Sequence, residues 1–224
     1  MKKLLFCLLA LGVTFSSQAQ SARVGLRAGL TFSSLYYPRD YDPEPYRPGF
    51  TLAVPVEFPL TRHWALQPEL AFTTRGWRSE HVVYVNPRGK YVSRRIYSGY
   101  TTSLEIPVTF KYYVNSLRQG AYLLAGPMAE VWMYGAYRDD DDDFVRYNYA
   151  WQGSDRVRLG LALGVGYLWR QTKLPLYAEL RFQDTWLGPG RREYAHVRGV
   201  TLSGGLWLPG GKAARPVKRS TRRR

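Results

Sequence analysis

A small set of polar side chains in the sequence has the chemistry that catalysis needs. The set consists of two histidines, two serines and an aspartate: His81, His196, Ser79, Ser98 and Asp184. A histidine can activate a serine as a nucleophile only if the two side chains lie within hydrogen-bonding distance. No catalytic signature surrounds either serine, and nothing in the spacing brings a histidine to one of them. The sequence therefore predicts a protein that is not an enzyme and that uses no cofactor.

A run of five aspartates is the candidate for a metal site: Asp139, Asp140, Asp141, Asp142 and Asp143. The run lacks the alternating ligands, the central glycine and the distal glutamate of an EF-hand loop. Adjacent carboxylates could still gather a divalent ion or bridge through it to lipopolysaccharide phosphates. The expected alternative is a solvated loop whose charge is offset by Arg138 and Arg146. We predict no metal centre.

These residues lie on or between segments in which apolar and polar side chains alternate. In residues 103–114, SLEIPVTFKYYV, the apolar side chains occupy every second position, which is typical of a strand with two different faces. The same period recurs in seven other segments: 23–32, 49–58, 63–72, 121–133, 156–169, 174–182 and 199–208. Each segment is close to the roughly 9–11 residues that a tilted membrane-spanning strand requires. The sequence predicts eight strands.

The connections between these strands alternate in length. Residues 59–62, 114–120 and 170–173 are short connections, whereas the long ones are 33–48, 73–100, 134–155 and 183–198. Short turns at one end and long loops at the other are typical of outer-membrane barrels. The sequence therefore predicts an all-β fold, an eight-stranded antiparallel up-and-down transmembrane β-barrel. Within 73–100, two strand-like stretches flank residues 86–89, which predicts that the third and fourth strands extend past the membrane as a hairpin.

The apolar row of each strand could face either a soluble core or lipid. The polar row combines charged residues with small ones such as Gly25, Ala162 and Gly164, which suits the narrow interior of an eight-stranded barrel. We therefore expect the apolar row to face lipid, with a soluble ligand-binding barrel as the alternative. Unpaired buried charge is costly, so the inward charges should pair and fill the lumen, although a conducting path is possible. The predicted lumen charge network is Arg27, Glu57, Glu69, Glu105, Lys111, Glu130, Arg158, Arg170, Glu179 and Arg181.

Aromatic residues gather near the strand ends, as expected for the two membrane interfaces. One predicted belt contains Trp64, Tyr112, Tyr113, Trp169 and Trp207, and the other contains Trp77, Tyr100, Trp132, Tyr134 and Trp186. The outer loops are also rich in tyrosine and arginine, which are favoured in recognition surfaces. The arginines predicted to contact a partner or lipopolysaccharide phosphates are Arg75, Arg78, Arg94, Arg95, Arg191 and Arg192.

The two ends of the sequence differ from the barrel segment, 20–208. Residues 1–19 contain two lysines, then an apolar run, and end in a small-x-small cleavage site. These features predict a signal peptide that is cleaved on export through the inner membrane. The mature chain would then contain no cysteine, because Cys7 lies in this segment. Residues 209–224 lack hydrophobic periodicity and should be a disordered basic tail. Seven of the basic residues lie in that tail, which leaves the barrel segment only mildly positive, and no nucleic-acid-binding motif is present, so we expect no nucleic-acid partner.

Four segments together resemble the PorT-like family of outer-membrane β-barrels. They are VGLRAGLTFSS (24–34), SLEIPVTFKYYV (103–114), LGLALGVGYLW (159–169) and LYAELRFQDTWLG (176–188). The resemblance implies location in the outer membrane, an eight-stranded barrel and no known catalytic residues. One member of that family takes part in secretion across the outer membrane. This chain departs from such barrels at its end, because Leu208 is followed by PGGKAARPVKRSTRRR rather than by the end of the chain.

The sequence thus predicts a non-enzymatic envelope scaffold or docking protein that acts through the outer loops, the basic tail, or both. Its expected surroundings are outer-membrane lipid and lipopolysaccharide, with envelope or secretion-system proteins as possible partners. Two alternatives are a component of an outer-membrane secretion system, as the PorT-like resemblance implies, and a narrow pore for small solutes.

Overall fold

The structure is a computed structural model of the chain. It describes residues 22–36, 45–84, 91–115, 119–139, 145–148, 156–169, 174–186 and 196–208. The predicted signal peptide, the basic tail and residues Asp140 to Asp143, Arg170, Arg191 and Arg192 lie outside these ranges. Among the described residues, no helix is long and apolar enough to cross a membrane.

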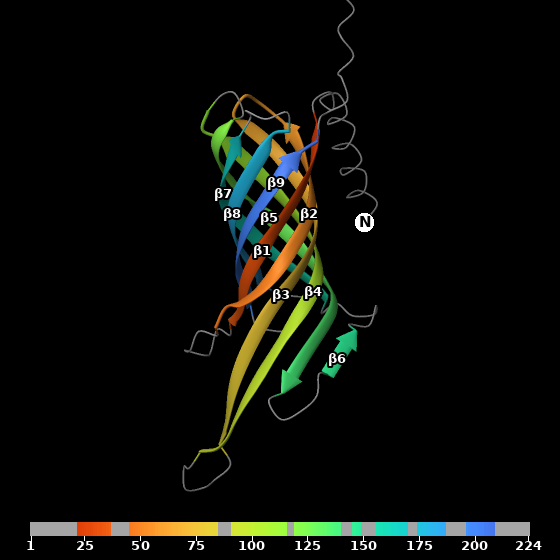
Figure 1. Cartoon of the computed structure of the whole chain (residues 1–224), viewed down its shortest axis with the longest axis vertical. Coiled ribbons are helices and arrows are strands. Elements are labelled where there is room, and N and C mark those ends of the chain that lie inside the picture. The colour runs from red at the N-terminus through yellow and green to blue at the C-terminus, as the bar shows by residue number, and fades with distance from the viewer. Residues whose placement is uncertain are drawn as a thin grey trace, which may run out of the picture.

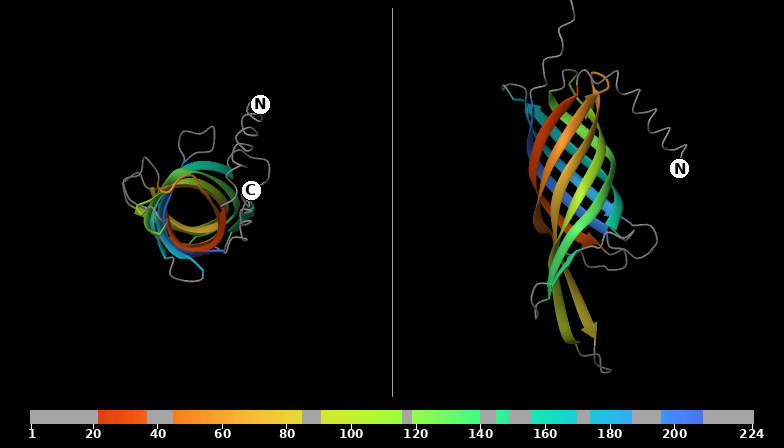
Figure 2. Two further views of the ribbon diagram at one scale, coloured as in Figure 1. Left: turned by 90° about the horizontal axis from the view of Figure 1, so that it is seen from above. Right: turned by 90° about the vertical axis from the view of Figure 1, so that its right-hand side faces the viewer.

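Eight strands form a closed antiparallel barrel, as predicted (Figures 1 and 2). They are β1 (Arg23–Tyr36), β2 (Arg47–Pro59), β3 (Trp64–Tyr84), β4 (Tyr91–Tyr113), β5 (Gly120–Asp139), β7 (Val157–Trp169), β8 (Leu176–Trp186) and β9 (His196–Trp207). Each strand pairs with the next one along the chain, and β1 pairs with β9 to close the wall. The short strand β6 (Val145–Asn148) pairs with β5 alone, outside the barrel.

The apolar row of each strand lies on the outside of the barrel. In β7, Leu159, Leu161 and Leu163 keep 60%, 45% and 49% of their surface exposed, whereas the intervening Ala162 is fully buried. A soluble barrel would bury the leucines and expose the polar row. The observed arrangement instead gives the barrel an apolar belt that contacts lipid.

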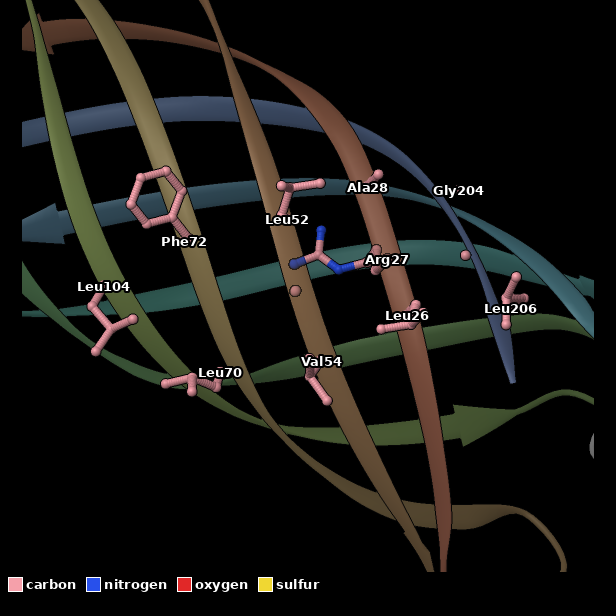
Figure 3. Close-up of a pocket in the computed structure, with 12 residues that line it drawn as sticks. Leu26, Arg27, Ala28, Leu52, Val54, Leu70, Phe72, Leu104, Gly204 and Leu206 are labelled. Carbon is pink, nitrogen blue, oxygen red and sulfur yellow. The ribbon is translucent and has the colours of Figure 1, made fainter. Parts of the chain in front are cut away.

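A shallow hollow interrupts this apolar belt where small residues face outward. Ala28 of β1 pairs with Gly204 of β9, and leucines from the neighbouring strands surround the pair (Figure 3). The hollow has a volume of about 550 Å³. Arg27 contributes to its floor, but this side chain is 4% exposed and is held by Glu69 inside the barrel. The hollow is therefore an apolar feature of the lipid-facing surface.

Aromatic rings mark both ends of the apolar belt, with corrections to the predicted membership. At the short-turn end Trp64 contacts Tyr112, with ring centroids 5.0 Å apart, and at the other end Tyr100 and Tyr134 are 6.1 Å apart. Three residues predicted to belong to these belts lie in the barrel interior instead: Tyr113, Trp132 and Trp207. Tyr113 faces inward because it follows Tyr112, and successive residues of a strand point to opposite faces.

A sheet continues beyond the barrel at the long-loop end. Pairing of β3 with β4 persists to Tyr84 opposite Tyr91, which confirms the predicted hairpin extension and makes most of the expected loop 73–100 regular strand. The end of β5 pairs with β4 as far as Asp139 opposite Tyr97, and β6 then pairs with β5. No alternating pattern in the sequence predicts β6. We call the parts of β3, β4, β5 and β6 beyond Gly76 and Tyr100 the projecting sheet (Figure 1).

Candidate functional site

The barrel interior holds most of the charged residues that the sequence singled out. The structure describes nine of the ten predicted lumen residues, all of them at most 9% exposed: Arg27, Glu57, Glu69, Glu105, Lys111, Glu130, Arg158, Glu179 and Arg181. The tenth, Arg170, lies outside the described residues. These side chains share the interior because each occupies the polar row of its strand.

The middle of the interior contains an ion-pair network formed by four residues. Arg27 Nε lies 3.0 Å from Glu69 Oε1, and Arg181 donates to the same carboxylate, with Nη2 3.1 Å from Oε1. Arg181 Nε also donates to Glu179 Oε2 over 2.7 Å. The network joins β1, β3 and β8 across the lumen. Each glutamate therefore has an arginine partner, as a buried charge requires.

Next to this network, Lys111 occupies a site made of acids and aromatic rings. Its ammonium nitrogen is 3.1 Å from Glu179 Oε1 and 3.9 Å from Glu57 Oε2. The same nitrogen lies 4.1 Å from the ring centroid of Tyr122 and 5.4 Å from those of Tyr177 and Trp207. Two carboxylates and three π-faces thus replace the water that the ammonium group loses on burial.

The aromatic residues around Lys111 fill the short-turn end of the barrel. Tyr113 donates its hydroxyl hydrogen bond to Glu57, and Tyr122 donates to Glu179 Oε1 over 2.7 Å. The rings pack together with small and aliphatic side chains into one buried cluster: Ala65, Tyr113, Tyr122, Leu124, Leu168, Tyr177 and Trp207. We call this cluster the aromatic plug. Eight-stranded barrels are just wide enough for side chains to fill them, and the plug does so here.

A second charged group lies nearer the long-loop end. Glu105 and Glu130 are directly opposite each other on β4 and β5, an arrangement that repels unless a cation intervenes. Arg75 supplies that cation, with Nη2 2.5 Å from Glu105 Oε1 and Nε 3.8 Å from Glu130 Oε1. Gln183 Nε2 donates a further hydrogen bond to Glu105 over 3.2 Å. The guanidinium carbon of Arg158 stacks 3.6 Å from the ring centroid of Trp132.

The position of Arg75 corrects a prediction. We expected it in an outer loop, in contact with a partner or lipopolysaccharide, but it is 2% exposed and lies in the lumen. The loop was expected to begin at residue 73, whereas β3 continues unbroken through this region. Arg75 therefore keeps the inward orientation of Thr73, two residues before it.

The remaining predicted contact residues are placed differently. Arg78 lies on β3 in the projecting sheet and is partly exposed. The structure places Arg94 and Arg95 on β4 by backbone register, opposite Val82 and His81.

Two of the residues with catalytic chemistry meet at the rim of the barrel. His196 Nδ1 lies 3.5 Å from Asp184 Oδ1, and Arg198 Nε donates to Asp184 Oδ2 over 3.1 Å. Ser98 is on β4, which pairs with β3 and β5 rather than with the strands of this histidine and aspartate. No group of three or more histidine, cysteine or acidic residues in the described ranges could hold a metal ion.

Together, the two charged groups and the aromatic plug occupy the lumen over most of its height. Their partners come from every side of the wall, so they tie strands together that are far apart in sequence. The chemistry available to this interior is charge pairing and cation–π contact between fixed side chains. Its direct consequence is a barrel whose lumen is filled by side chains.

Comparison with solved structures identifies outer-membrane barrels of similar architecture. A major outer-membrane protein from Thermus thermophilus has a TM-score of 0.50 at 15% identity, over 84% of this chain and 100% of that one. Ail, the attachment invasion locus protein of Yersinia pestis, has a TM-score of 0.45 at 13% identity, over 84% and 99% of the two chains. Neisserial surface protein A has a TM-score of 0.43 at 14% identity, over 84% and 98%. The likeness to the Thermus protein supports the fold.

Sequence comparison identifies the family. No curated protein sequence matches the chain. Residues 18–183 match the family model described as an outer membrane protein beta-barrel domain, which covers most of the chain and every barrel strand from β1 to β7. This match agrees with the closed eight-stranded barrel and its lipid-facing leucines. The chain belongs to the outer membrane protein beta-barrel domain family, and the protein resides in the outer membrane.

Proposed function

We propose that the protein is a non-enzymatic docking protein or scaffold of the outer membrane that binds an envelope protein through its projecting sheet. The observation that carries this proposal is a contrast between the two parts of the molecule. The barrel interior is filled by paired charges and aromatic rings, whereas the projecting sheet stands clear of the lipid-facing belt (Figure 2). A surface function therefore fits the molecule better than transport through the lumen.

The length of β4 supports this role for the sheet. Tyr100, at the aromatic belt, is 40% exposed, and β4 continues from there to Tyr91. At about 3.3 Å per residue, those nine residues span roughly 30 Å, enough to pass beyond lipid headgroups. Membrane crossing by itself needs only about 9–11 residues per strand, so the extra length requires another explanation.

The edges and composition of the sheet also suit docking. Pairing between β2 and β3 ends at Arg47 opposite Gly76, so β3 beyond this point forms one edge of the sheet, and β6 forms the other. A sheet edge offers backbone donors and acceptors to an added strand. Residues 77–100 are rich in tyrosine and arginine, which recur at the centres of protein interfaces.

A second candidate is a component of a PorT-like secretion system. It is favoured by the four segments that resemble that family and by the basic residues of 209–224. The two candidates differ in where the partner binds, because β1 begins and β9 ends at the short-turn side, whereas the projecting sheet lies at the opposite side (Figure 1). A narrow pore is less well supported, since solute would have to pass the aromatic plug.

The test is purification from native membranes in mild detergent, followed by identification of stoichiometric partners. One variant replaces residues 80–96 with Asn-Gly, which joins Ser79 to Tyr97 at positions that already pair. A second variant ends at residue 209. We expect the wild type to retain a partner that the shortened hairpin loses. Loss of the partner only from the variant that ends at residue 209 would instead favour a secretion component. A wild-type barrel that purifies without a partner would overturn the proposal.

A further inference from the structure

The register of the projecting sheet brings three arginines to neighbouring positions. Arg78 of β3 is directly opposite Ser98 of β4, and Ser98 is directly opposite Arg138 of β5. Arg146 of β6 is opposite Ala136, two residues from Arg138. These residues come from different strands, so their proximity is a property of the sheet rather than of any one segment.

The three arginine positions share the outer face of the sheet. The alternation of β3 runs without a register shift from Phe72, which faces lipid and is 37% exposed, to Arg78. Residues directly opposite in adjacent strands lie on the same face, so the position of Arg138 belongs to the face of Arg78. The position of Arg146 joins them through Ala136, because positions two apart in a strand share a face. With strands about 4.8 Å apart, the backbone positions of Arg78 and Arg138 are about 10 Å apart along the row.

The row lies immediately beyond the aromatic belt. Tyr100, whose ring contacts that of Tyr134, is opposite Gly76 and Ala136 in the sheet. Arg78 and Arg138 each lie two residues farther from the barrel, at the next position on the same face. Tyrosines of such belts sit at the level of lipid headgroups. The arginines are therefore placed at the level of the headgroup phosphates rather than among acyl chains or far out in solvent.

Local packing holds this part of the sheet in place. Trp77 is directly opposite Gly99, and a Cβ on Gly99 would lie 2.8 Å from Trp77 Cζ2, so the glycine makes room for the indole. Two acidic positions in the described part of the sheet lie beside the row rather than in it. The position of Asp139 pairs with Tyr97 and thus lies on the other face, and Glu80 is the next position outward from Arg78.

We propose that Arg78, Arg138 and Arg146 form a binding site for the phosphate groups of an outer-leaflet glycolipid headgroup, that is, of lipopolysaccharide. Guanidinium groups donate paired hydrogen bonds that match phosphate oxygens, and several of them on one face match a headgroup with more than one phosphate. The site would fix the depth and rotation of the barrel in the outer leaflet and hold the projecting sheet upright. This inference does not depend on the docking function.

The test measures lipid binding by native mass spectrometry of the full chain released from detergent. The probes are diphosphorylated lipid A, the same lipid after removal of its phosphates, inorganic phosphate, and an octaglutamate peptide. The site variant is Arg78→Gln/Arg138→Gln/Arg146→Gln. The matched control is Arg62→Gln/Lys212→Gln/Arg215→Gln, which removes the same charge from a short turn and the tail. Folding of each variant is checked by the heat-dependent shift of the barrel in gel electrophoresis.

We expect the wild type and the control to bind diphosphorylated lipid A at least tenfold more tightly than the dephosphorylated lipid. The site variant should lose this preference while remaining folded. Equal binding of the two lipids by the wild type, or equal loss in the control, would overturn the proposal. So would binding of inorganic phosphate as tight as that of lipid A, which would indicate an anion site without headgroup recognition. Binding of an octaglutamate peptide but of neither lipid would identify a protein-binding surface instead.

Discussion

The ammonium group of Lys111 lies 3.1 Å from the carboxylate of Glu179 in the closed interior of the barrel. Lys111 is on β4 and Glu179 on β8, which are separated in the wall by β5 and β7, so the pair spans the lumen. Both side chains are at most 1% exposed. A buried pair of this kind specifies which strands lie opposite each other across the lumen. Removing one partner leaves the other charge uncompensated.

Lys111→Met should destabilise the barrel strongly. The substitution removes the cation that faces Glu179 and Glu57, and breaking a buried pair costs about 3–5 kcal/mol. Urea unfolding in lipid bilayers measures the change in the free energy of unfolding. Adding Glu57→Gln to Lys111→Met should recover part of the loss. A change below about 1 kcal/mol for the single variant would contradict the inferred role.

Leu163→Arg tests which row of side chains contacts lipid. Leu163 is 49% exposed near the middle of β7, and an arginine at the bilayer midplane of a barrel costs about 2–4 kcal/mol. The measurement is unfolding in bilayers, with Leu163→Phe as a control that remains apolar. If Leu163→Arg is as stable as the wild type in bilayers, the outward row does not face lipid.

Gly166→Val should displace Tyr122 from the aromatic plug. A Cβ at Gly166 would lie 2.6 Å from Tyr122 Cε2, so a larger residue forces the ring away from Glu179 and Lys111. Overpacking of this kind costs about 1–3 kcal/mol. The second variant, Gly166→Val/Tyr122→Ala, removes the clash and should be no less stable than Tyr122→Ala alone. If the loss of unfolding free energy in the double variant equals the sum of the losses in the two single variants, the side chains at positions 166 and 122 are not in contact.

The wild-type barrel should not conduct ions in planar lipid bilayers. The interior is occupied by Arg27, Arg181 and their glutamate partners in the middle and by the aromatic plug at one end. Single-channel recording of the purified protein is the measurement, and Tyr122→Ala/Tyr177→Ala is the comparison, because it shortens two plug rings. Regular conductance steps from the wild type would show that the side chains move aside, and would revive the pore as a function.

Alternation along the strands was sufficient to predict much of the fold. A period of two in segments such as 156–169 identified both the lipid-facing leucines and the inward charges, because a strand has only two faces. The alternation of short and long connections predicted the up-and-down order. The sequence also indicated the hairpin of β3 and β4 from the strand-like stretches around residues 86–89.

The sequence-based predictions are wrong where a strand continues beyond its apolar alternation. They are also wrong where two neighbouring aromatic residues point to opposite faces of a strand. The sequence predicts a loop at Arg75 because the apolar alternation of β3 stops at Phe72, although backbone pairing continues. Residue type alone predicts that Tyr113 and Trp207 belong to the membrane belt, whereas their place in the alternation directs them inward. The strand β6 has only four residues, and its pairing depends on the position of β5.

By itself, then, the sequence determined which residues face lipid and which face the lumen, since that choice depends only on position along a strand. Only the tertiary structure decided which charges meet. Arg27 and Glu69 are 42 residues apart, and Lys111 and Glu179 are farther apart still. Their contacts depend on the closure of the barrel and on the stagger between strands, which set the height of each side chain in the lumen. The same stagger aligns the positions of Arg78, Arg138 and Arg146, whose spacing in the sequence carries no sign of a shared site.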